Sequence, residues 1–112
     1  MKKKFYKLQQ TDNAGNVCEY ILSENGKPVI LPDFPELECF SECSKVSHNR
    51  SYNISECRTG QKLYYGGWGP SSLKDAIMKA NDLIKHHGVE KVERACKIAE
   101  MNYGLSPWTL NK

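Results

Sequence analysis

Apolar and polar positions alternate with a period of two in the first part of the chain, which predicts β-strands at Lys4–Gln10 and Val17–Ser23. Asn and Gly accept the positive φ angles of tight turns, so residues 12–16 predict a loop between these strands. Asn25 and Gly26 predict a hairpin that leads into a return strand at Pro28–Leu31. The pattern therefore predicts a three-stranded antiparallel meander.

The next segment, residues 32–50, has no clear period. Pro32 and Pro35 interrupt it, and residues 36–46 fit either a short helix or an irregular loop. Strand-like runs return at 52–57 and 62–65, where Gly60 supplies the turn of a second hairpin. The glycine-rich residues 66–70 predict a connection.

A helical period follows over about residues 71–87, where six apolar residues form one stripe. They are Leu73, Ala76, Ile77, Ala80, Leu83 and Ile84. Ser72 with Asp75 resembles a capping box, and Gly88 predicts the end of the helix. We expect the stripe to be a core face.

A second helix is predicted from Val89 to Tyr103, with Gly104 ending it. Its inward residues are expected to be Val92, Ala95, Cys96 and Ala99. Pro107 can then open a final turn that carries Trp108.

Together these elements predict a single α+β domain over residues 1–112. We expect a largely antiparallel sheet of about five strands, followed by two C-terminal helices packed on one face. A chain of 112 residues that is 39% hydrophobic has room and material for one core.

The start of the chain is basic, but the apolar run of a signal peptide does not follow it. The longest aliphatic stretch, residues 29–31, is far shorter than the roughly 20 residues that cross a bilayer. We therefore expect a cytoplasmic protein without a membrane partner.

Five cysteines are an odd number, and without an export signal they argue against a disulfide framework. Buried free thiols are the simplest interpretation. The alternative is a zinc-stapled loop, because zinc takes thiolate and imidazole ligands. Its ligands would be Cys39, Cys43, His48 and Cys57, and a helix over 36–46 would put the first two on one face. The spacing departs from that of a zinc knuckle, so we expect no metal and no other cofactor.

Catalytic motifs are missing from the sequence: it has no Walker loop, GxGxxG, GxSxG or HExxH. His86 and His87 are accounted for by the last turn of the first helix, where a cation is favourable. We expect that the protein is not an enzyme.

Nucleic-acid binding is one alternative function. Lys2, Lys3, Lys4 and Lys7 would form a basic arm, and exposed aromatic residues could stack on bases. The net charge of +3 is small, however, and the predicted helices carry both signs of charge.

The favoured function is recognition of another protein, or self-association, by a small non-catalytic binding or accessory protein. Tyr64, Tyr65, Trp68 and Trp108 are the candidate binding residues, because Trp and Tyr dominate interface hot spots. A hairpin followed by a capped helix is also a layout of many small accessory proteins of bacteria and their mobile elements, which implies no role for any residue.

Overall fold

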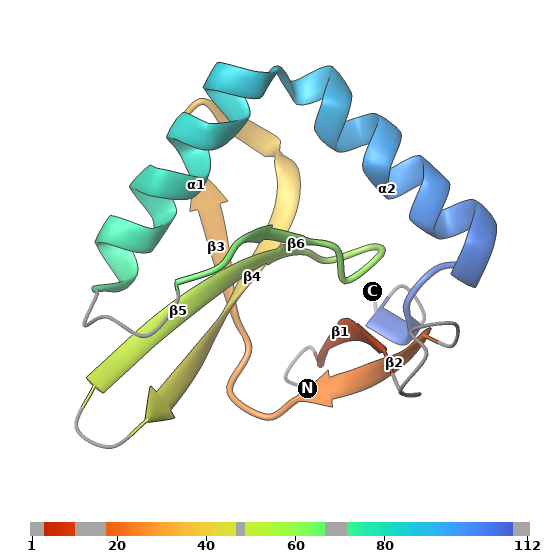
Figure 1. Ribbon diagram of the computed structural model, residues 1–112, viewed down its shortest axis with the longest axis horizontal. Coiled ribbons are helices and arrows are strands. Elements are labelled where there is room, and N and C mark those ends of the chain that lie inside the picture. Colours follow the sequence, from red (N-terminus) through yellow and green to blue (C-terminus); the bar gives the residue numbers. More distant parts are fainter. Residues whose placement is uncertain (1–3, 11–17, 47–48, 67–71, 109–112) are drawn as a thin grey trace.

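The fold consists of a strand-rich first part and a helical second part (Figure 1). A computed structural model of the chain describes residues 4–10, 18–46, 49–66 and 72–108. The strands in these ranges are β1 (Phe5–Gln10), β2 (Cys18–Ser23), β3 (Lys27–Leu31), β4 (Phe34–Val46), β5 (Asn49–Glu56) and β6 (Lys62–Tyr64). The helices are α1 (Leu73–His87) and α2 (Val89–Tyr103). Neither of these two described helices has the length and apolar character needed to cross a membrane.

The strands form two antiparallel sheets. β1 pairs with β2, and β3, β4, β5 and β6 pair in that order. This arrangement confirms the α+β class, the antiparallel pairing of the first two strands and the second hairpin, whose Gly60 has a φ of 67°. A meander is present, but β3, β4, β5 and β6 form it, so the predicted three-stranded meander of the first strands is wrong. The pairing expected between the second and third strands is wrong, because β2 and β3 belong to different sheets.

Asn25 and Gly26 form a corner between the two sheets. Asn25 Oδ1 accepts a hydrogen bond of 2.7 Å from the Cys43 backbone N–H, and Asn25 Nδ2 donates one of 2.9 Å to the Cys43 carbonyl. β3 pairs only as far as Ser41, so this side chain continues the pairing of β4 beyond the end of β3. The dipeptide therefore turns the chain without pairing β2 with β3.

Residues 36–46, which the sequence assigned to either a short helix or an irregular loop, belong to a long strand. Both expectations are therefore wrong. β4 spans 13 residues and pairs with β3 on one side and β5 on the other. Cys39 is buried in the cluster that contains α1, and its neighbour Phe40 is buried in a second cluster. Because successive side chains point to opposite faces, the middle of β4 is buried on both. The alternation of polar and apolar residues over 36–39 ends at Phe40, so the sequence contains only a short stretch of the pattern that reveals a half-exposed strand.

The α1 helix has the predicted boundaries and cap. Ser72 Oγ accepts a hydrogen bond of 3.1 Å from the Asp75 N–H, and Gly88 ends the helix with a φ of 91°. Ala76, Ala80 and Ile84 are buried in one cluster with Val29, Leu31, Cys39 and Ile54 of the four-stranded sheet. The predicted stripe therefore packs against that sheet.

The prediction that Leu83 of α1 is a core residue is wrong. Leu83 is 41% exposed, whereas the polar Asn81 is buried. Asn81 Oδ1 accepts a hydrogen bond of 2.9 Å from the Asp33 N–H, and its Nδ2 donates one of 2.7 Å to Asp33 Oδ2. These bonds fix the rotation of α1 against the turn between β3 and β4.

The α2 helix has the predicted boundaries but diverges from α1 at Gly88, and it runs toward the β1–β2 sheet (Figure 1). At its end, the Tyr20 hydroxyl of β2 donates to the Gly104 carbonyl, and Arg58 lies 3.0 Å from the Glu100 carboxylate. Among its expected inward residues, Ala99 is buried and Val92, Ala95 and Cys96 are half-buried. The helix is held at both ends and covered less completely than α1.

A second apolar cluster joins the β1–β2 sheet to the rest of the protein. It contains Phe5, Phe40, Cys57 and Trp108, and the rings of Phe5 and Phe40 stack with centroids 5.1 Å apart. Ser106 Oγ donates a hydrogen bond of 3.1 Å to the Cys57 carbonyl. Ser106 and Trp108, which follow α2, are therefore part of this core.

Candidate functional site

The four aromatic residues predicted to form a binding surface do not share one environment. Trp108 is 2% exposed, so its predicted place on a binding surface is wrong. Tyr64 is half-buried against the α1 cluster. Tyr65 is exposed, with Lys62 Nζ 5.1 Å from its ring centroid. Trp68 lies outside the described residues, so its predicted role is not examined by the structure.

The candidate zinc ligands that the structure describes do not converge on one point. Cys39 and Cys43 lie on the strand β4, where four residues span about 13 Å, too far for one ion. Cys57 belongs to the second cluster, and His48 lies outside the described residues. Within the described ranges, no group of three His, Cys, Asp or Glu side chains is arranged to hold a metal ion.

Two thiols, Cys39 of β4 and Cys96 of α2, lie close enough for Cys96 to affect the ionisation of Cys39. Burial, and to a smaller extent the Glu56 carboxylate, raises the pKa of Cys39 to about 12 and that of Cys96 to about 11. A thiol must lose its proton to act as a nucleophile. Both cysteines are therefore protonated at neutral pH, which is typical of structural thiols.

A buried carboxylate that no sequence pattern singled out, Glu56, lies beneath α2. Glu56 Oε1 accepts a hydrogen bond of 2.9 Å from the Arg58 N–H. Glu56 Oε2 accepts two from Thr59, 2.9 Å from the N–H and 2.6 Å from the hydroxyl. The acid also lines a cavity of about 400 Å³ with Leu37 and Cys96. These bonds close the turn before β6, so they assign Glu56 a structural role, which a Glu-x-x-Thr pattern ahead of Gly60 could have suggested.

The side of α2 that faces away from the core carries exposed apolar residues. Ile98 is 52% exposed and Met101 is 78% exposed. Side chains three and four positions apart share one side of a helix, so these two lie in line with Lys91 and Arg94. These four residues are called the outer face of α2. Leu105, 45% exposed, follows just after the helix.

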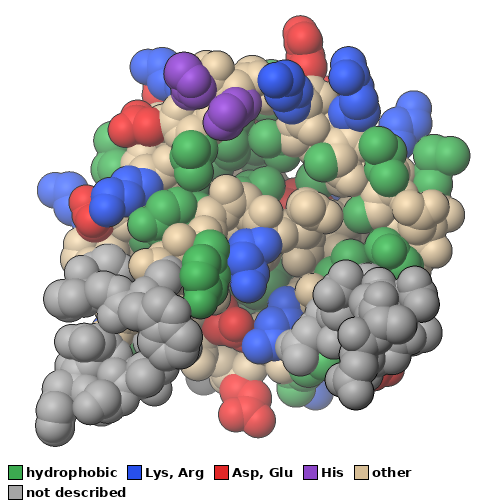
Figure 2. Space-filling model, in the orientation of Figure 1, with side chains coloured by type: hydrophobic (Ala, Val, Ile, Leu, Met, Phe, Trp, Pro, Cys, Tyr) green, Lys and Arg blue, Asp and Glu red, His purple; other side chains and the backbone are tan. Residues whose placement is uncertain are grey.

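The first half of this outer face is basic. Lys91 and Arg94 are exposed, and neither takes part in an ion pair within the described part of the chain. Hydrophobic and basic side chains come together along the right side of the molecule, where α2 lies (Figure 2). The sequence predicts both signs of charge on this helix and no apolar outer surface. The sequence did contain one indication of this exposed apolar face: at helical spacing, Ile98 and Met101 lie opposite the inward residues Cys96 and Ala99.

Comparisons with known proteins add no assignment, since no family model, curated protein or solved structure matches the chain.

Proposed function

We propose that the protein is a non-catalytic binding protein, and that the outer face of α2 binds an acidic, amphipathic segment of another protein. The observation that carries this proposal is the exposure of Ile98 and Met101 side by side on an anchored helix. Scattered exposed apolar residues are ordinary, but neighbouring ones on one helix face are typical of partner recognition.

The acidic character of the partner follows from the energetics. Because Ile98 and Met101 are already partly buried, their complete burial stabilises a complex by roughly 2–4 kcal/mol before the cost of association. That range alone corresponds to millimolar affinity or weaker. Lys91 and Arg94 continue the same face, so carboxylates opposite them add charge-assisted hydrogen bonds and faster association. This surface is distinct from the aromatic surface expected from the sequence, of which Tyr65 is exposed.

The test is a quantitative pull-down that compares the double variant Ile98→Ala, Met101→Ala with the wild type. Ala favours a helix and both side chains are exposed, so the variant should fold normally. Met78→Ala on α1 is the matched control, because Met78 is also an exposed helical methionine. We expect the wild type and the control to retain a protein that the double variant loses.

The retained protein must then meet a second criterion. Its binding segment, made as a peptide, should be acidic and amphipathic. Lys91→Glu with Arg94→Glu should weaken its binding, and added salt should weaken it as well. A double variant that retains the same partners as the wild type would refute the proposal.

Two further outcomes would replace the proposal with another function. Sedimentation that shows a dimer dependent on Met101 would assign the outer face to a second copy of the chain. Single-stranded oligonucleotide binding that is tight, falls steeply with salt and is unchanged in the double variant would favour the nucleic-acid alternative.

A further inference from the structure

Met101 is the most exposed large apolar side chain of the described residues. It is 78% exposed, against 52% for Ile98 on the same face and 41% for Met78 on α1. Its thioether sulfur can take up an oxygen atom, and sulfur oxidation in proteins follows the accessibility of the side chain. The apolar half of the outer face of α2 therefore carries a side chain whose polarity a mild oxidant can change.

The cysteines whose side chains the structure describes are less accessible to an oxidant. Cys39 and Cys57 are each 2% exposed, and Cys43 and Cys96 are half-buried. Peroxides oxidise a thiolate rather than a thiol, and burial raises the pKa of Cys39 to about 12 and that of Cys96 to about 11. Within the described ranges, Met101 is therefore the most accessible side chain that contains sulfur.

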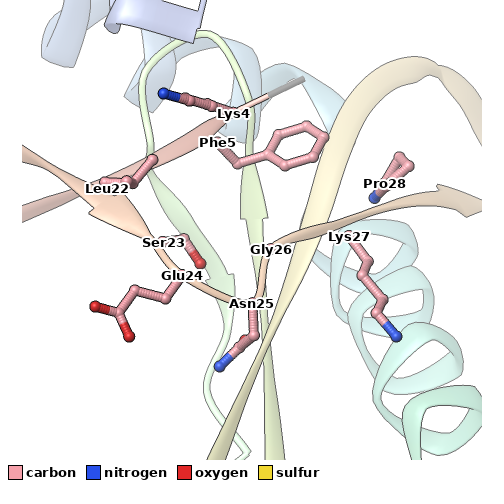
Figure 3. A pocket seen from close by; sticks show the side chains of 9 residues that line it. All are labelled: Lys4, Phe5, Leu22, Ser23, Glu24, Asn25, Gly26, Lys27 and Pro28. Atoms are coloured by element: carbon pink, nitrogen blue, oxygen red, sulfur yellow. The ribbon is translucent and has the colours of Figure 1, made fainter. Parts of the chain in front are cut away.

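The exposed apolar residues at the corner between the two sheets lack this chemistry. A hollow of about 640 Å³ at the corner has Phe5, Leu22 and Pro28 in its lining (Figure 3). Leu22 is 42% exposed, but its side chain, like those of Phe5 and Pro28, contains no sulfur for a peroxide to oxidise. A mild oxidant therefore changes the outer face of α2 and leaves this corner as it is.

Oxidation of Met101 changes the outer face without removing core packing. Because the side chain lies mostly in solvent, its sulfoxide displaces few protein atoms. A partner that covers the sulfoxide must remove water from a strongly polar S=O group, and it no longer buries an apolar thioether there. The fold is therefore retained while the affinity for an apolar partner segment falls.

We propose that Met101 is a redox-sensitive site at which oxidation by a peroxide switches off partner binding by the outer face of α2. This inference rests on the function proposed above. The sulfur lone pair attacks one peroxide oxygen, the O–O bond breaks and an S–O bond forms. The sulfur loses two electrons, and the second oxygen leaves as water. A methionine sulfoxide reductase restores the thioether, because two thiols of its reductant form a disulfide and the sulfoxide oxygen leaves as water.

The first experiment needs no partner. The protein is treated with hydrogen peroxide and digested with trypsin, which separates Met78 in the peptide 75–79 from Met101 in the peptide 98–112. Tandem mass spectrometry should show Met101 oxidised about twice as fast as Met78, in line with their exposed fractions. Protein oxidised at Met101 should melt within about 3 °C of untreated protein. Slower oxidation of Met101 than of Met78, or a larger fall in Tm, overturns the proposal.

The second experiment measures partner capture in the pull-down described above. Peroxide should lower the affinity of the wild type for the captured protein about tenfold. Methionine sulfoxide reductase with dithiothreitol should restore that affinity. Met78→Leu is the matched control and should lose capture on oxidation as the wild type does. Met101→Leu has no sulfur at this position, so peroxide should leave its capture at the level that the same variant shows before treatment.

The outcomes separate this inference from the binding function. Capture that persists in the oxidised wild type, or that Met101→Leu loses on treatment, overturns the redox proposal and leaves the binding function standing. An untreated wild type that captures no protein refutes the binding function, and the redox proposal fails with it.

Discussion

The buried Glu56 provides the sharpest test of the structure. Its carboxylate accepts one hydrogen bond from Arg58 and two from Thr59, and Thr59 is fully buried. Glu56→Ala leaves the N–H and the hydroxyl of Thr59 without partners, at about 1–3 kcal/mol each. Relief of the desolvated carboxylate offsets part of that cost. We expect a net loss of about 3 kcal/mol in the free energy of unfolding.

Glu56→Gln should be much milder for a geometric reason. The amide oxygen can take the position of Oε2 and keep both hydrogen bonds from Thr59. Only the bond from the half-buried Arg58 N–H is lost, because the amide nitrogen cannot accept it. We expect a cost of about 1 kcal/mol.

Urea unfolding followed by circular dichroism measures both variants, and thermal melting checks them. A loss of about 3 kcal/mol corresponds to a fall of roughly 10–15 °C in Tm for a domain of this size. Glu36 lines the same cavity but is exposed, so Glu36→Ala and Glu36→Gln should change stability by less than about 0.5 kcal/mol. If Glu56→Gln costs as much as Glu56→Ala, the assigned hydrogen bonds are wrong.

Four other measurements follow from the fold. Ile84→Ala should cost about 2–5 kcal/mol in urea unfolding, whereas the exposed Leu83→Ala should cost less than about 1 kcal/mol. Cys39 and Cys96 should react with a disulfide reagent at pH 8 only on unfolding, because burial raises the pKa of each thiol; rapid reaction of the folded protein would contradict this. The hydrogen bond from Asn81 of α1, and then the charge of Lys85, lower the pKa of Asp33, so the contribution of the ionised carboxylate to folding stability is present above about pH 4 and is lost as the pH falls further. The difference in the free energy of unfolding between the wild type and Asp33→Asn should therefore shrink over that range. Elemental analysis of protein purified without chelator should find no stoichiometric zinc, and one equivalent would revive the zinc hypothesis.

The helices were predictable because several local signals agreed. For α1, the apolar stripe, the Ser72 cap and the Gly88 stop all gave the same boundaries, and Val89 and Gly104 delimited α2 equally well. Capping bonds and helical periodicity depend on residues a few positions apart. They can therefore be read without knowing the tertiary structure.

The strands were harder to predict because their environment depends on distant residues. The β4 strand is buried by α1 on one side and by the cluster around Phe5 and Trp108 on the other, and neither contact is local. The same cause explains the misplaced Trp108. Its residue type, which dominates interface hot spots, suggested a binding surface, but Phe5 of β1 and Phe40 of β4 pack beside it in the folded protein.

The outer face of α2 could not be ranked from the sequence because its exposure depends on how the helix is held. Ile98 and Met101 would be core residues if α2 lay flat between two layers. Instead its start is fixed by Gly88, and its end by the contacts of Tyr20 with Gly104 and of Arg58 with Glu100. A helix anchored at both ends cannot rotate its apolar residues inward. It also loses little conformational entropy when a partner binds, so a small apolar surface can contribute more of its burial energy to affinity.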